Sequence, residues 1–119
     1  MYKSFKEMPI WKLSMELAVE IFEITESFPK KEDYGVTSQI RRSALSISAN
    51  IAEGFGRFHN NDKINFYYYA RGSATETQSH LVYCKRVKYL NSDVVENLDK
   101  KLEDINKSLN KIIKTIRNS

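Results

Sequence analysis

Apolar residues return at alternating steps of three and four through almost the whole chain, and this spacing is typical of amphipathic α-helices. Only four glycines and two prolines occur among the 119 residues. These residues are too few to supply the turns of a many-stranded β fold. A chain of this length forms a single domain with its own core and needs no disulfide to do so. We therefore expect an all-α fold built from a few long helices.

Four segments carry the helical periodicity, and we expect helices at about residues 9–28, 36–56, 61–90 and 93–117. The connections between them are short, and no internal repeat or domain linker separates them. Helices joined in this way pack most simply as neighbours that run in opposite directions. The sequence therefore predicts one up-down-up-down antiparallel four-helix bundle over residues 1–119.

Turn-forming and capping residues set the expected helix ends. Pro9 fits the first helical turn, and Pro29 ends that helix because the residue before a proline avoids the α conformation. Asn60 and Asn61 are N-cap candidates for the third helix. Asn91 is expected to end that helix in a left-handed turn, with Ser92 capping the fourth.

The first helix is apolar on more than one face. Besides its main stripe it carries a second apolar flank, formed by Trp11, Met15 and Phe22. One antiparallel neighbour does not require so wide an apolar surface. We therefore expect a homo-oligomer in which these three residues contribute to the interface between copies.

Basic residues concentrate in the middle of the chain. The formal net charge is +4, with eight bases and three acids in residues 41–89 and a net negative charge in residues 1–40. Five of the six arginines lie in this central region, and arginine suits phosphate because its planar fork donates two parallel hydrogen bonds. This distribution favours a polyanionic partner such as RNA or DNA.

The candidate nucleic-acid-binding residues flank the turn between the second and third helices or cluster at the far end of the third: Arg57, Lys63, Tyr68, Lys85, Arg86 and Lys88. Tyr68 belongs to a run of three tyrosines that can stack on unpaired bases. Tyr67 in the same run lies on the apolar stripe, so core packing explains it more simply. We expect binding with little sequence preference and a strong dependence on salt.

Polar residues form a second stripe along the two central helices, which contains the interface candidates Arg42, Asn50, Glu53, Arg71 and Glu76. Antiparallel pairing brings Arg42 near Glu76 and Glu53 near Arg71. We expect these two pairs to be partly buried ion pairs within or between subunits. The alternative interpretation is a solvated face with ordinary surface ion pairs.

Residues for catalysis or metal binding are sparse. Glu76 and His80 form one pair four residues apart, and only His59 remains, so the paired motifs of a di-iron bundle are missing. Cys84 lies on the apolar stripe, where a thiol is ordinarily inert. No cofactor motif and no phosphate-binding glycine loop occurs. The chain is therefore not expected to be an enzyme, although a histidine phosphotransfer module using His80 stays as a distant third alternative.

The expected compartment is the cytoplasm. A single cysteine excludes an internal disulfide and is consistent with a reducing environment. No apolar run approaches the ~20 residues that span a bilayer, and the N-terminus has no signal-peptide pattern. We expect no membrane partner.

Two motifs are recognisable: the stretch from Ser38 to Arg57, which contains Asn50-Ile-Ala-Glu-Gly54 near its end, and Ala70-Arg-Gly-Ser73. Together they resemble the four-helix-bundle proteins encoded in intervening sequences of bacterial 23S ribosomal RNA genes. The resemblance covers about residues 5–115. Ser48-Ala49 departs from the proline and serine frequent in the family, and Ala74 from its leucine.

This resemblance implies an antiparallel four-helix bundle that assembles into a homopentamer, and no established activity. A related branch, the accessory proteins of diversity-generating retroelements, forms basic pentameric barrels that bind nucleic acid and a reverse transcriptase. The leading hypothesis is therefore a non-enzymatic, oligomeric bundle that binds nucleic acid, RNA in particular. The alternative is a scaffold that binds only protein.

Overall fold

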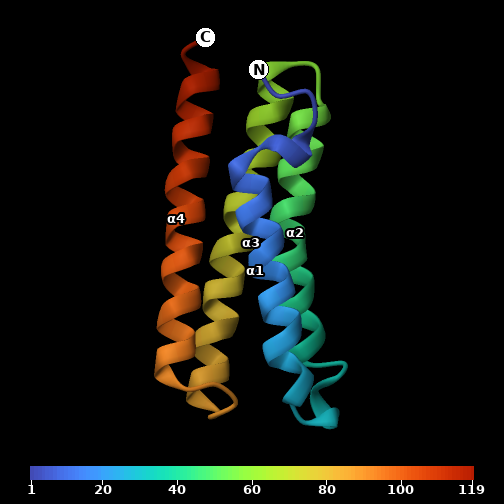
Figure 1. The fold of residues 1–119 in the computed structure, drawn as a ribbon, viewed down its shortest axis with the longest axis vertical. Helices are drawn as coiled ribbons and strands as arrows, with labels where there is room; N and C mark the ends of the chain where they lie inside the picture. Colours follow the sequence, from blue (N-terminus) through green and yellow to red (C-terminus); the bar gives the residue numbers. More distant parts are fainter.

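The computed structural model describes all 119 residues and consists of helices without any β-strand (Figure 1). The four long helices are α1 (Pro9–Ile24), α2 (Val36–Gly56), α3 (Asn60–Arg86) and α4 (Ser92–Arg117). Three short 3-10 turns accompany them: η1 (Phe5–Glu7), η2 (Thr25–Ser27) and η3 (Lys30–Glu32). The connections alternate between the two ends of the molecule, so each helix runs against the preceding one (Figure 1). The all-α, four-helix fold expected from the sequence is confirmed.

The most extensive helix contact is between α2 and α3, where small side chains let the two backbones approach. Ala44 on α2 and Ala70 and Ala74 on α3 are fully buried. Gly54 is also buried, and a Cβ added to it would lie 2.8 Å from the ring of Tyr67. This glycine is therefore a packing residue that receives an aromatic ring from α3.

Helix α1 ends at Ile24, four residues before the expected end, and side chains bond its last carbonyl groups. The hydroxyl of Thr25 donates to the carbonyl oxygens of Ile21 (2.7 Å) and Phe22 (3.0 Å). Arg41 of α2 donates its Nε–H to the same hydroxyl oxygen at 2.8 Å. The chain tightens there into the 3-10 turn η2 before Pro29 is reached.

Helix α3 ends at Arg86, also four residues early. Lys88 adopts a left-handed conformation with φ of 68°. Its N–H bonds to the carbonyl of Lys85 at 3.0 Å, and the N–H of Tyr89 bonds to that of Cys84 at 2.9 Å. This is the hydrogen-bond pattern of a left-handed helix C-terminus. The expectation that Asn91 would make this turn is wrong.

The caps of α3 and α4 also differ from those expected. Asn91, rather than Ser92, caps α4, because its side-chain oxygen accepts the N–H of Val94 at 2.9 Å. At the start of α3, His59 occupies the N-cap position without a side-chain hydrogen bond. Asn60 is therefore the first helical residue of α3 rather than its cap.

Helix α4 buries one seam and exposes its other faces. Its buried residues are Val95, Leu98, Leu102, Ile105, Leu109 and Ile113. Ile112, next to the last of these, is half-buried. None of the four helices has a stretch long and apolar enough to cross a lipid bilayer.

Candidate nucleic-acid interface

Three of the candidate basic residues stand free in solvent where α3 ends. Lys85, Arg86 and Lys88 are all exposed, and none forms an ion pair. Lys85 and Lys88 border a shallow depression together with Asn91 and Ser92. The left-handed turn at Lys88 places this residue on the outside of the loop between α3 and α4. These three cations are available to an anionic partner.

Arg57 and Lys63, the basic candidates at the opposite end of α3, already have partners in the chain. The ammonium group of Lys63 donates to the carbonyl oxygens of Gly54 (3.3 Å) and Phe55 (2.8 Å). It therefore satisfies the last carbonyl groups of α2, which the sequence did not reveal. Arg57 pairs with Glu53 at 3.0 Å and is stacked on Phe66, with 4.6 Å between the guanidinium carbon and the ring centre.

The three consecutive tyrosines of α3 have different environments. Tyr67 is buried, and this burial raises the pKa of its hydroxyl group. Tyr69 is exposed and contacts the edge of the Phe66 ring, with the centres 5.4 Å apart. Tyr68 lies between these extremes, half-buried against α4. Of the three, only Tyr67 belongs to the core, as its place on the apolar stripe indicated.

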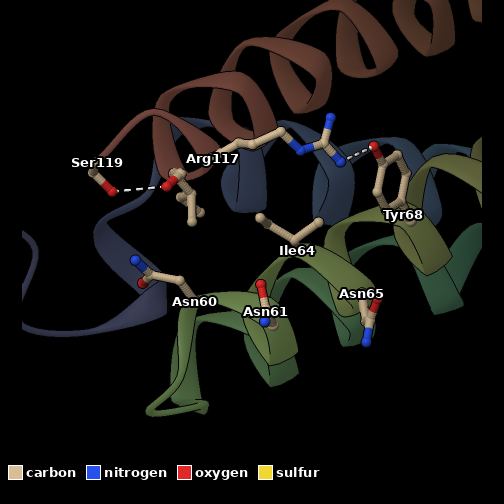
Figure 2. Close-up of a pocket in the computed structure, with 8 residues that line it drawn as sticks. Asn60, Asn61, Ile64, Asn65, Tyr68, Arg117 and Ser119 are labelled. Carbon is tan, nitrogen blue, oxygen red and sulfur yellow. Dashed lines mark hydrogen bonds between the residues drawn. The ribbon is translucent and has the colours of Figure 1, made fainter.

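Tyr68 is the centre of an arginine cluster that joins α3 to α4. Arg117 donates to the Tyr68 hydroxyl at 2.6 Å, and its guanidinium carbon lies 5.7 Å from the ring centre (Figure 2). The guanidinium carbon of Arg71 lies 4.8 Å from the same ring centre. Arg71 also donates to the side-chain oxygen of Asn110 on α4 at 2.7 Å. We call Tyr68, Arg71 and Arg117 the Tyr68 cluster.

The Tyr68 cluster borders a pocket of about 610 Å³ at the end of the bundle where α3 starts and α4 finishes (Figure 2). Its lining residues include Asn60, Asn61 and Asn65 on α3 and Ile116 and Arg117 on α4. The wall is therefore mostly polar. Sequence reasoning did not identify Arg117 as a candidate.

The charges of α3 and α4 are separated along the bundle. Residues 60–75 and 105–119, which form the half that contains the pocket, carry six basic side chains and a single acidic one, Asp62. The other half, residues 76–86 and 92–104, carries six acidic and four basic side chains. Within α4 all five acids lie in the first half of the helix, whereas four of its six bases lie in the last half.

The predicted pair between Arg42 and Glu76 is present, with a distance of 2.9 Å between Nη2 and Oε2. Its two side chains are 62% and 41% exposed, however, so the pair is on the surface and not partly buried as expected. His80 approaches the same carboxylate oxygen at 3.3 Å, and no third metal-ligating side chain joins them. The pair is a surface bridge between α2 and α3.

The second predicted pair, Glu53 with Arg71, does not form. Glu53 instead pairs with Arg57 one turn along its own helix, and Arg71 points to α4. Asn50 likewise bonds within α2, donating to the carbonyl oxygen of Ser46 at 2.9 Å. The polar stripe is therefore not a continuous seam between α2 and α3. Asn50 and Glu53 have partners one turn away in α2, Arg71 bonds to α4, and only Arg42 and Glu76 bridge the two helices.

The apolar flank of α1 is divided between contacts within the chain and exposed surface. Trp11 packs edge-on against Phe5 of η1, with ring centres 5.1 Å apart. Met15 and Phe22 line a narrow apolar groove with Val19 and Leu45, a cavity of about 200 Å³ between α1 and α2. The side chains of Phe22, Val19 and Leu45 are exposed by 48%, 50% and 53%. Packing against the N-terminal turn η1 therefore accounts for the apolar side chain of Trp11. The groove that contains Met15 and Phe22 is the part of the flank that nothing in the chain covers.

Cys84 is fully buried. Burial, with a smaller contribution from the carboxylate of Glu32, raises the pKa of its thiol to about 11. A thiol in this state is protonated at neutral pH and is a poor nucleophile.

The fold and its motifs agree with comparisons to known proteins. The model of the 23S rRNA-intervening sequence protein family matches residues 6–111, so the chain belongs to this family. A crystal structure from Bacteroides thetaiotaomicron VPI-5482 is similar, with a TM-score of 0.79 and 30% sequence identity, covering 88% of this chain and 98% of that chain. It is described as a protein with unknown function from the S23 ribosomal protein family. Comparison with curated protein sequences finds no match.

Proposed function

We propose that this protein is a non-enzymatic helical bundle that binds nucleic acid, RNA in particular, in the reducing cytoplasm. The observation that carries the proposal is the unpaired state of Lys85, Arg86 and Lys88, which are exposed together at the end of α3. Cations without carboxylate partners can neutralise phosphates and release their counterions. The chain belongs to the 23S rRNA-intervening sequence protein family, and this membership supports RNA as the first polyanion to test.

In this proposal the protein acts as a homo-oligomer, and a pentamer is the first oligomeric state to test. The apolar groove of Met15, Val19, Phe22 and Leu45 supports self-association, because soluble monomers rarely leave such residues exposed together. A ring of five copies would repeat each basic cluster five times and form a positively charged rim. Light scattering tests this point, and a mass of 13.9 kDa, that of a single chain, at micromolar concentration would contradict it.

A gel-shift assay with a generic single-stranded RNA at about 50 mM and 200 mM salt tests RNA binding. Replacing Lys85, Arg86 and Lys88 together with glutamine is expected to weaken binding and to reduce its salt dependence. The matched control replaces the exposed residues Lys3, Lys6 and Lys12, which changes the net charge equally. Equal loss of binding in both variants, or no RNA or DNA retarded at low salt, would overturn the proposal.

A protein-binding scaffold is the second candidate, and the same apolar groove favours it. If the groove binds another protein, then Phe22→Ser and Leu45→Ser should abolish that complex without changing the helix content of the free chain. A histidine phosphotransfer module finds less support, because the His80 side chain is 18% exposed and lies against Glu76. Phosphate transfer needs an accessible imidazole.

A further inference from the structure

The Tyr68 cluster holds two guanidinium groups that no carboxylate neutralises. Arg117 donates to a tyrosine hydroxyl at 2.6 Å, and Arg71 donates to an asparagine amide oxygen at 2.7 Å. Both acceptors are neutral, and neither arginine takes part in an ion pair. A guanidinium has five N–H donors. Each arginine therefore keeps its full charge and has donors left for an incoming anion.

The aromatic ring keeps these two positive groups in place. Both guanidinium carbons lie within 6 Å of the centre of the Tyr68 ring, at 4.8 and 5.7 Å. At such distances a ring face attracts a cation, which offsets part of the repulsion between the two arginines. The side chains are thus ordered before any ligand arrives, and ordering them on binding costs less entropy.

The surroundings add to the positive field. Lys107, Lys111 and Lys114 occupy the last turns of α4, and no acidic side chain follows Asp104 in the sequence. Lys114 precedes Arg117 by three residues, so the two are neighbours on the helix surface. An anion at the Tyr68 cluster therefore meets several cations from two helices.

The pocket beside the cluster has the size and the polar groups for one nucleotide. Its volume of about 610 Å³ lies within the usual range of ligand sites, roughly 300–1,000 Å³. Asn60 and Asn61 border the pocket at the start of α3 (Figure 2), and their amides can both donate and accept hydrogen bonds. Such groups suit a ribose hydroxyl or a base edge next to a phosphate.

We propose that the Tyr68 cluster and this pocket bind one nucleotide of a single-stranded RNA. Arg71 and Arg117 contact the phosphate oxygens, and the asparagine amides contact the adjoining ribose or base. The inference rests on the proposed function and adds to it a structured contact at the opposite end of α3 from Lys85. The ring of Tyr68 positions the arginines and does not stack on a base.

Fluorescence anisotropy with a labelled ten-residue oligouridylate tests the site. Replacing Arg71 and Arg117 together with glutamine is expected to raise Kd about tenfold at about 50 mM salt. The slope of log Kd against log salt should fall by about 1.4, because each lost phosphate contact on a single strand contributes about 0.7. The control is Lys12→Gln with Lys100→Gln, two exposed lysines that do not border the pocket. It changes the net charge equally and should leave Kd within twofold.

A second variant separates charge from geometry. Replacing both arginines with lysine keeps the charge but removes the planar fork, so Kd should rise several-fold while the salt slope is retained. This conservative variant also tests the site if circular dichroism shows that the glutamine variant is unfolded. Lysine variants that bind like the unaltered protein would overturn the site.

The outcomes also separate the site from the function. If the unaltered protein binds RNA and the glutamine variant binds as tightly as its control, the Tyr68 site is wrong and the proposed function stands. If the unaltered protein binds no RNA at about 50 mM salt, both are wrong.

Discussion

The hydroxyl oxygens of Ser43 on α2 and Thr77 on α3 lie 2.9 Å apart within the most extensive helix contact. Neither residue is exposed to solvent. Each hydroxyl also reaches a carbonyl of its own helix, Ile40 at 3.2 Å and Ser73 at 2.8 Å. The pair is therefore satisfied without water, and it requires residues 43 and 77 to face each other. It fixes the register of α2 against α3.

A double-mutant cycle on this pair should show coupling. Ser43→Ala and Thr77→Val each remove one hydroxyl and are each expected to lower the free energy of unfolding by about 1–2 kcal/mol. The double variant should lose less than the sum, by about 0.5–1.5 kcal/mol, because it leaves no unpaired partner. Urea denaturation measures all four proteins. Strict additivity would show that the two hydroxyl groups act independently.

Adding a methyl group at Gly54 should destabilise the bundle. The new Cβ would lie 2.8 Å from the Tyr67 ring, which is buried and cannot move aside. Overpacking of this kind costs about 1–3 kcal/mol. Gly72→Ala is the matched control, because its Cβ meets nothing within 4 Å. In the middle of α3 this control should instead stabilise by about 0.5–1 kcal/mol, as thermal unfolding can measure.

Glu76→Ala should change stability little. The Arg42–Glu76 pair is exposed on both sides, and exposed pairs contribute about 0–1 kcal/mol. The effect should shrink further in high salt, which screens surface charges. A loss of about 3 kcal/mol or more would indicate that assembly buries the pair between subunits.

Lys88→Gly should make the chain more stable. The φ of 68° at Lys88 is unfavourable for residues with a Cβ, by about 1–2 kcal/mol. Glycine removes this strain but has more freedom when unfolded, so the net gain should be about 0.5–1 kcal/mol. Lys88→Ala loses the same charge and keeps the strain, and thermal unfolding of the two variants separates these effects. An equal melting temperature in both would contradict the assignment of strain.

The stability of the protein should fall at high pH in part because of Cys84. In the unfolded chain the thiol ionises near 9.0, whereas in the folded chain its pKa is about 11. Its stabilising contribution is therefore full below pH 9 and is lost as the pH rises towards 11, since the unfolded state releases its proton first. Cys84→Ala should flatten this fall in denaturation experiments between pH 8 and 11.

The flattening should be partial. Burial raises the pKa of Tyr67, and a hydrogen bond to Glu32 raises that of Tyr89, so both tyrosines act in the same direction as Cys84. A pH profile that is unchanged by the Cys84→Ala substitution would show that the thiol does not titrate between the two states.

Spacing alone places Ile40, Ala44, Ile47 and Ile51 on one face of any regular helix, and all four are fully buried in the core. It could not predict the contact between Tyr68 and Arg117, which are 49 residues apart and meet only through the register of α3 on α4. That register depends on where the chain turns, and the left-handed residue in that turn is a lysine rather than the expected asparagine.

The other wrong expectations concern charged side chains that found partners nearby in the chain. Glu53 lies one turn from Arg57 in its own helix, so a partner across the helix interface has no advantage. Lys63 is long enough to fold back onto the end of α2. A sequence shows which residues share a helix face. A flexible charged side chain can reach several partners, however, and its choice among them depends on backbone positions that only the folded structure gives.

The separation of acidic and basic residues along α3 and α4 gives the molecule a permanent electric dipole moment along its longest dimension, 46 Å. Near a polyanion such a molecule experiences a torque that turns the end with Arg117 forward before any contact is made. At physiological salt the field decays over about 8 Å, so this rotation takes place in the last nanometre of approach. In dilute buffer it begins farther out, and encounters become faster as well as better oriented.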